Sequence, residues 1–246
     1  KHDNIDFHTF KLYFFKLLIS NSHNSFDIIL NYNYNDKEII QKINEDKFIT
    51  NISMPVFNYY NQKQELENIK FLFNSNNEFI IPISNKRNII TGLNDLNDDF
   101  SIVIDFEYSS THIFLISLFR YLNKKVKYIF KINMKDILNS IYSNEYELCF
   151  ISTVFPSKRF TDYMEDKGDN LRILDYENLN LRNYFNININ FELKDFNLSN
   201  VSKSFLPTKI NNEVYTIYKP FIKLINFKYS FIANKNLNKD LIYNLV

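Results

Sequence analysis

Polar side chains stand at four places where a strand-like run of residues gives way to a helix-like run, namely residues 6–9, 32–35, 107–111 and 152–156. Hydroxyl groups at such junctions, together with the N–H groups of a first helical turn, can donate hydrogen bonds to a carboxylate. Tyrosine rings beside them can form the wall of a pocket. We therefore expect a ligand-binding site composed of His8, Thr9, Asn33, Tyr34, Tyr108, Ser109, Ser110, Thr111, Ser152 and Thr153.

The serine and threonine residues at these junctions also have a simpler interpretation as helix N-caps. A capping side chain stabilises a helix by about 1 kcal/mol and needs no ligand. The recurrence of polar residues at four junctions makes a binding site as good an interpretation as capping, because the carboxyl ends of parallel strands share one edge of a sheet and α/β folds bind ligands there.

Catalytic and metal-binding patterns are missing from the sequence. His2, His8, His23 and His112 lack the spacing of metal ligands, and two glycines cannot build a glycine-rich phosphate loop. The single cysteine, Cys149, lies in an apolar run, which is typical of a buried, inert thiol. His112 stands near a helix start, where a solvated or capping role is favoured. We therefore expect no catalytic residue, no metal, no cofactor and no enzymatic activity.

Composition and charge restrict the function classes further. Hydrophobic residues make up 45% of the 246 residues, which is enough for a packed core. The formal net charge of +1 gives no broad attraction to nucleic acid. The richest apolar run, residues 12–19, is interrupted by Lys16 and is shorter than the ~20 residues of a membrane span. The abundance of Asn, Lys, Ile, Tyr and Phe indicates an AT-rich genome.

Strand-like and helix-like segments alternate along most of the chain. Strands are predicted at residues 26–30, 47–52, 69–73, 79–83, 101–105, 126–130, 147–152, 171–174 and 228–233. Helices are predicted at residues 10–19, 36–43, 56–60, 134–141 and 158–166, after Ser109-Ser110-Thr111, and from Asn238. Residues 186–227 are expected to be strand-rich and irregular. Alternation with short connections predicts parallel strands covered by helices on both faces.

The order of these segments resembles the TAXI family of TRAP-transporter solute-binding proteins. Residues 35–43 are similar to the family's helix after its Gly-Ser loop, and residues 79–111 to its crossing strand, turn, next strand and Ser-Gly-Thr ligand loop. Residues 152–156 stand where the family has a Gly-x-Pro loop, and residues 233–244 resemble its C-terminal segment. The family's loop glycines are replaced here by bulkier residues, which should narrow the cleft.

The resemblance implies an α/β fold of the two-lobed type II periplasmic-binding-protein kind. Each lobe would be a mostly parallel sheet flanked by helices, and two crossing strands would join the lobes. Lobe one would comprise residues 1–83 and 228–246, and lobe two residues 84–227. The chain would capture a small organic acid, either a dicarboxylate or an amino acid, between its lobes for a membrane permease. It would lie outside the cytoplasm, in the periplasm or secreted.

Two further hypotheses come from other classes of protein. The lost glycines favour a repurposed scaffold with a degenerate cleft, serving as a structural or interaction protein of a virus or a parasite. An enzyme on the same fold is disfavoured, because no acid–base pair or nucleophile stands out in the sequence.

Overall fold

The computed structural model describes residues 40, 42–43, 49–62, 68–97, 100–177, 179, 181–187, 191–201 and 221–237. The predicted helix at residues 10–19, the strand at 26–30 and the helix from Asn238 lie outside this part of the chain. Ile40, Lys42 and Ile43 are helical, as predicted.

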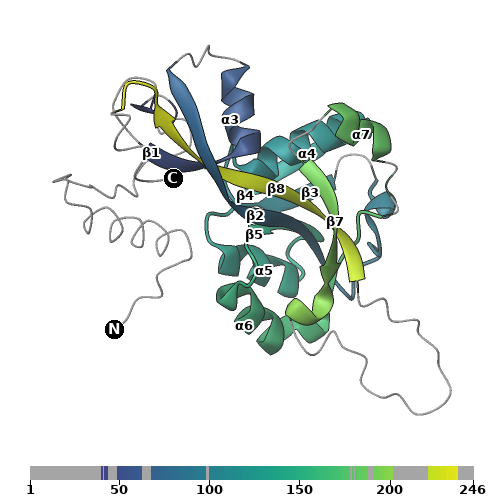
Figure 1. Ribbon diagram of the computed structural model, residues 1–246. Helices are drawn as coiled ribbons and strands as arrows, with labels where there is room; N and C mark the ends of the chain where they lie inside the picture. The colour runs from purple at the N-terminus through teal and green to yellow at the C-terminus, as the bar shows by residue number, and fades with distance from the viewer. Residues whose placement is uncertain are drawn as a thin grey trace. The chain divides into compact units, whose positions relative to one another are not determined.

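Strands and helices alternate through the described chain, and the α/β fold class is confirmed (Figure 1). In chain order the elements are β1 (Ile49–Ser53), α3 (Met54–Asn61), β2 (Ile69–Asn85), β3 (Phe100–Ile104), α4 (Ser110–Tyr121), β4 (Val126–Phe130), α5 (Met134–Tyr142), β5 (Leu148–Thr153), α6 (Lys158–Lys167), β6 (Leu171–Ile173), α7 (Arg182–Ile187), β7 (Phe191–Asn197) and β8 (Phe221–Asn234). Short 3-10 turns occupy Leu93–Asp95, Gly168–Asn170 and Leu198–Asn200.

The chain divides into two compact units. Unit 1 comprises Lys1–Thr50, Leu66–Phe73 and Phe231–Val246, and unit 2 comprises Asn51–Glu65 and Asn74–Ser230. Strands β2 and β8 contribute residues to both units. Within unit 1, the rings of Phe73 and Phe231 pack at 4.8 Å between centroids. The lobe boundaries expected from the sequence stay a prediction.

Strand β2 is one continuous strand, whereas the sequence predicts two strands at residues 69–73 and 79–83. The division into two strands is wrong, because the polar side chains between residues 73 and 79 form hydrogen bonds across the sheet. The hydroxyl of Ser75 donates to Asn51 Oδ1 at 2.9 Å, and that of Ser230 donates to Asn74 Oδ1 at 2.8 Å. A run of Asn and Ser that is typical of a turn therefore continues as a strand.

The centre of unit 2 is a parallel arrangement of β5, β3 and β4. Phe100 pairs with Val126 in β4, and Ile102 pairs with Leu148 in β5, both in parallel register. The long strand β2 adds to β5 in antiparallel register, with Phe79 opposite Thr153. The full strand order is β1-β8-β2-β5-β3-β4, with β6 beside β2 and β7 beside β8.

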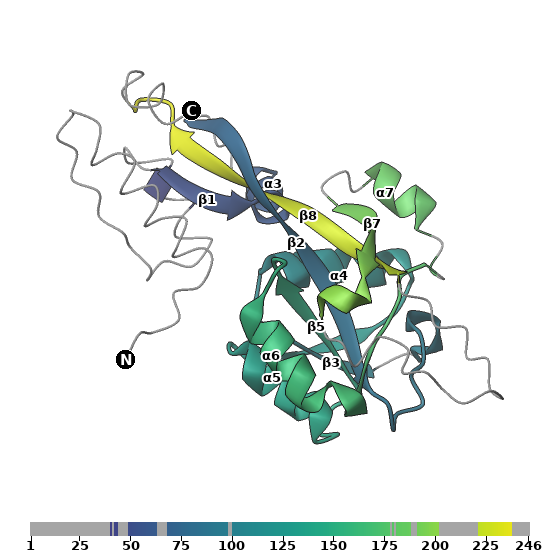
Figure 2. The same ribbon diagram turned by 60° about the horizontal axis from the view of Figure 1, so that its bottom comes forward.

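Helices cover both faces of this parallel centre (Figures 1 and 2). The chain passes from β3 to β4 through α4, and returns across β3 to β5 through α5. Because such crossovers are right-handed, the reversal of direction places α4 and α5 on opposite faces. Helices α5 and α6 lie side by side, and the hydroxyl of Tyr163 donates to Asn139 Oδ1 at 2.9 Å between them.

The core of unit 2 follows the apolar pattern of the sequence. All residues of the run Leu148-Cys149-Phe150-Ile151 are buried in β5, as expected for a strand covered on both faces. The predicted stripe of α5 is confirmed, since Ile137, Leu138 and Ile141 are buried there.

Candidate functional site

The strand order defines a topological switch point between β3 and β5. The connections that leave the carboxyl ends of these two neighbouring strands run in opposite directions, the first toward β4 and the second toward β6 beside β2. In open α/β sheets, ligands bind outside the carboxyl ends of the strands at such a point. All six described residues of the predicted site lie here: Tyr108, Ser109, Ser110 and Thr111 after β3, and Ser152 and Thr153 at the end of β5.

Asp105 follows the last residue of β3 and is tied to the start of α4. The hydroxyl of Ser109 donates to Asp105 Oδ1 at 2.5 Å. The same oxygen of Ser109 accepts the N–H of His112 at 3.1 Å, so Ser109 is the N-cap of α4. The capping interpretation of Ser109 is therefore correct. A carboxylate consequently lies next to the positive end of the α4 dipole.

Tyr108 takes a left-handed backbone conformation, with φ of 62°. This conformation costs a non-glycine residue about 1 kcal/mol or more. His112 compensates in part, because its Nδ1 accepts the N–H of Tyr108 at 2.9 Å. Burial lowers the pKa of His112, although the nearby Glu107 carboxylate opposes the shift. His112 is thus a buried acceptor, and the solvated role considered from the sequence is wrong.

Aromatic rings surround this turn. The Tyr108 ring stacks on Tyr59 of α3 at 5.8 Å between centroids. The His112 ring contacts Tyr128 at 4.6 Å and Phe130 at 5.2 Å, both edge-on. The Tyr108 ring therefore has a partner on α3, and the His112 ring beside it contacts β4, neither of which the sequence identified.

The first turns of α3 and α4 meet at two hydroxyl groups. Ser53, the N-cap of α3, accepts a hydrogen bond of 2.6 Å from Ser110, and both side chains are buried. Thr111 is also fully buried, and its Oγ1 has no hydrogen-bond partner among the described residues. The N–H groups of a first helical turn lack partners inside the helix. Donors therefore gather at the start of α4 beside Asp105.

A second carboxylate lies across the switch point on β2. Glu78 is only 7% exposed, and its Oε2 accepts the hydroxyl of Ser152 at 2.5 Å. Its backbone carbonyl accepts the amide of Asn226 from β8 at 2.9 Å. The antiparallel register explains the pairing with Ser152, because Ile80 is opposite Ser152 and Glu78 projects from the same face as Ile80.

Burial raises the pKa of Asp105 from 3.8 to about 6. The hydrogen bonds from Ser109 and the neighbouring backbone lower it, and the Glu78 carboxylate raises it further. The carboxyl end of β3 is therefore a site where a negative charge is destabilised at neutral pH. A bound cation would relieve this cost.

The loop after β5 is filled by aromatic packing. Phe155 contacts Phe196 at 4.6 Å, Phe160 at 5.8 Å and Phe79 at 6.1 Å between ring centroids. Thr153 is half-buried, and its hydroxyl makes a long bond of 3.4 Å to the carbonyl of Val154. Phe155 therefore packs against the core from this loop, where the predicted resemblance would place a glycine.

Six of the predicted site residues lie at the carboxyl ends of β3 and β5, and the other four are not described by the structure. His8, Thr9, Asn33 and Tyr34 lie outside the described residues. Four residues that the sequence did not predict each contact one of these six, namely Asp105, Glu78, Ser53 and Tyr59. Asp105 could have been predicted from the sequence, because it is a polar residue directly after a buried strand. Glu78 could not, because its place beside Ser152 depends on the pairing of β2 with β5. Among the described residues, no three or more His, Cys, Asp or Glu side chains lie close enough together to bind a metal ion.

Comparison with known proteins places the fold. No protein-family model matches the chain, and no curated protein matches it by sequence. Among solved structures, XAC2383 from Xanthomonas citri bound to ATP matches with a TM-score of 0.55 at 7% identity, over 95% of this chain and 74% of the other. A TctC solute-binding protein from Polaromonas matches with 0.50 at 10% identity, over 89% and 69%.

A third match comes from work on glutathione import through GshT and the cystine importer TcyBC of Streptococcus mutans. It has a TM-score of 0.50 at 14% identity and covers 97% of this chain and 76% of the other. The chain thus has an α/β fold of the periplasmic-binding-protein type. The finer resemblance to the TAXI family stays a prediction. Among the helices that the structure describes, none is both long and apolar enough to cross a membrane.

Proposed function

We propose that the chain is a solute-binding protein and that the carboxyl ends of β3 and β5 in unit 2 bind the solute. The solute would be handed to a membrane permease outside the cytoplasm, as the resemblance to transport proteins implies. The fold supports this class of function, and the switch point supports the location.

Of the two ligand classes expected from the sequence, an amino acid fits the residues better than a dicarboxylate. The observation that carries this choice is the hydrogen-bonded pair of Asp105 and Ser109 at the start of α4. The Asp105 carboxylate would be stabilised by a cation, and the N-terminus of α4 directly beside it would be stabilised by an anion. The ammonium group and the carboxylate of an amino acid, attached to one carbon atom, would satisfy both. Glu78 adds negative charge, which would repel the second carboxylate of a dicarboxylate.

The proposed roles follow from the contacts. Asp105 would accept hydrogen bonds from the ligand ammonium, and Glu78 would add to the negative field that favours it. The first-turn N–H groups of α4 and the unpartnered Thr111 hydroxyl would donate to the ligand carboxylate. Tyr108 and Tyr59 would form the wall. His8, Thr9, Asn33, Tyr34, Ser110, Ser152 and Thr153 remain proposed site residues.

A thermal-shift screen of the standard amino acids against the short dicarboxylates tests this proposal. A ligand present at about 100 times its dissociation constant should stabilise the chain by about 2.7 kcal/mol. We expect at least one amino acid, and no dicarboxylate, to raise the melting temperature. Stabilisation by dicarboxylates alone would reject the amino-acid assignment, and no stabilisation by any solute would reject the whole proposal.

The second candidate is a binding-protein-like scaffold that acts as a structural or interaction protein. Two observations favour it. The hydroxyls of Ser109, Ser110 and Ser152 are already used in internal hydrogen bonds. Phe155 fills the loop after β5 with aromatic contacts. If no solute raises the melting temperature in the thermal-shift screen, this second candidate function is the better explanation.

A further inference from the structure

Strand β4 ends the sheet of unit 2. Within the part of the chain that the structure describes, β4 pairs with β3 and with no other strand. One side of β4 therefore has no strand among the described residues to receive its backbone N–H and C=O groups. Such an edge is a template on which another extended segment can form hydrogen bonds.

The sequence along this edge is strongly basic. Residues 124–135 contain five lysines and no aspartate or glutamate, in a chain whose net charge is only +1. Lys131 pairs with Glu145 at 3.1 Å. Lys125, Lys127 and Lys135 are exposed and form no ion pair with another described residue. The positive charge of the edge is thus largely uncompensated within the described chain.

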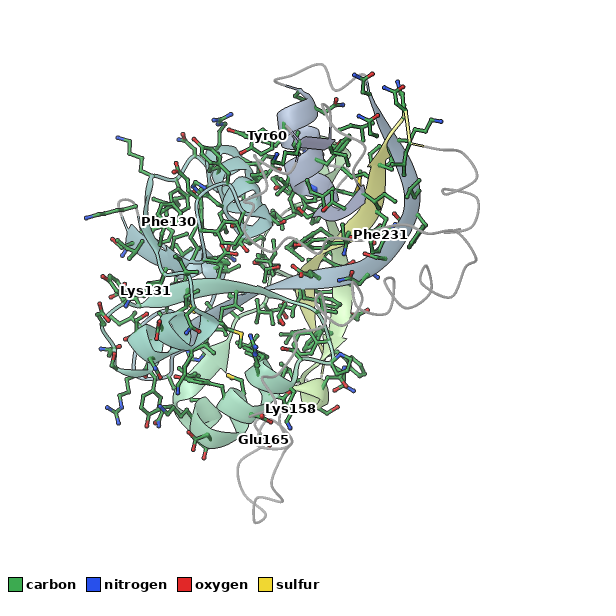
Figure 3. All side chains as sticks on the ribbon, turned by 90° about the vertical axis from the view of Figure 1, so that its left-hand side faces the viewer. Tyr60, Phe130, Lys131, Lys158, Glu165 and Phe231 are labelled. Atoms are coloured by element: carbon green, nitrogen blue, oxygen red, sulfur yellow. The ribbon has the colours of Figure 1, made fainter. Side chains whose placement is uncertain are left out.

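Exposed apolar side chains lie between these lysines. Phe130 is 43% exposed and Ile132 is 88% exposed. Figure 3 shows Phe130 and Lys131 at the margin of unit 2, away from Lys158 on α6. The edge therefore presents backbone hydrogen-bonding groups, apolar contacts and positive charge together.

We propose that the edge of β4 binds an acidic, extended segment of a partner protein as an added strand. Lysines on an edge strand oppose pairing with a second copy of the same edge, because like charges would meet across the new ladder. They do not oppose a strand whose side chains alternate between acidic and apolar residues. Its carboxylates would pair with Lys125 and Lys127, and its apolar residues would cover Phe130. Phe130 also contacts the His112 ring, so this edge adjoins the proposed solute site, whereas Lys125 and Lys127 are not among the proposed site residues.

A labelled peptide of alternating glutamate and valine, six residues long, serves as the probe, and fluorescence polarisation measures its dissociation constant. The double variant Lys125→Glu/Lys127→Glu should raise that constant about tenfold or more at low salt, and added salt should weaken binding to the wild type. The matched variant Lys158→Glu changes an exposed lysine on α6 and should bind as the wild type does. Circular dichroism verifies that each variant folds.

Hydrogen exchange distinguishes strand addition from simple charge attraction. The bound peptide should slow the exchange of amides in β4 (Val126–Phe130), and a version of the peptide with proline in place of valine should not bind. The proposal is overturned if neither peptide binds, if the charge-reversed variant binds equally well, or if protection appears elsewhere. Binding of duplex DNA or phosphatidylglycerol vesicles in preference to the acidic peptide would also overturn it.

Discussion

Replacement of Asp105 by asparagine should weaken amino-acid binding about 100-fold, which corresponds to about 2.7 kcal/mol. The variant keeps the size of the side chain but removes the charge that the ligand ammonium would pair with. Its amide can also turn a donor toward that ammonium, which adds repulsion. Isothermal titration calorimetry at pH 7.5 with the amino acid identified by the screen measures the loss.

The matched control for this prediction is Asp162→Asn. Asp162 is an exposed carboxylate on α6 and is not one of the proposed site residues. The variant Asp162→Asn removes the same charge from the chain but leaves the Asp105–Ser109 hydrogen bond in place. Its affinity for the amino acid should stay within about twofold of that of the wild type. Equal affinity of Asp105→Asn and the wild type would remove Asp105 from the site.

The stability of the ligand-free chain should depend on pH through the same carboxyl group. The pKa of Asp105 is about 6 in the folded state, above its ordinary value of 3.8, so the folded chain binds this proton more tightly than the unfolded chain. The stabilisation is complete below pH 3.8 and is lost as the pH rises through about 6. The full difference is about 3 kcal/mol.

Other groups also titrate, so the comparison of the wild type with Asp105→Asn isolates this contribution. Burial lowers the pKa of His112, for example, which acts against stability as the pH falls. Denaturant unfolding at several values between pH 4 and pH 8 gives the free energy of each protein. The wild type should lose most of the ~3 kcal/mol relative to the variant over this range. A constant difference between them would show that Asp105 is not buried as a charge.

The two expectations together describe a residue whose charge is unfavourable for folding and favourable for binding. At neutral pH, Asp105→Asn should therefore be more stable than the wild type while binding poorly. Such a trade between stability and activity is common at functional sites. A variant that lost both properties would instead indicate a purely structural role for the bond from Ser109.

Sequence patterns predicted the local elements of unit 2 well, because each element is determined by the types and spacing of residues close together in the chain. The α5 stripe of Ile137, Leu138 and Ile141, the apolar run of β5 and the N-cap Ser109 are examples. Each of them depends mainly on neighbouring residues. The sequence also placed Ser109 and Ser152 at strand ends, which was sufficient to bring both to the same edge of the sheet.

Local sequence patterns could not predict which residues far apart in the chain come into contact. The polar run from Asn74 is typical of a turn, and it continues β2 only because partners such as Ser230 lie opposite it. Glu78 enters the site through the antiparallel register of β2 with β5. Tyr59 reaches Tyr108 because α3 and α4 start side by side at Ser53 and Ser110. None of these contacts has a signal in the residues next to it.

We propose that the start of α4 and the end of β5 bind the solute. Backbone amide chemical shifts, followed by NMR while the amino acid found in the screen is added, test this claim most directly. We predict that the largest shifts fall on Tyr108, Ser109, Ser110 and Thr153. Saturable shifts confined to other parts of the chain, with these four amides unchanged, would contradict it.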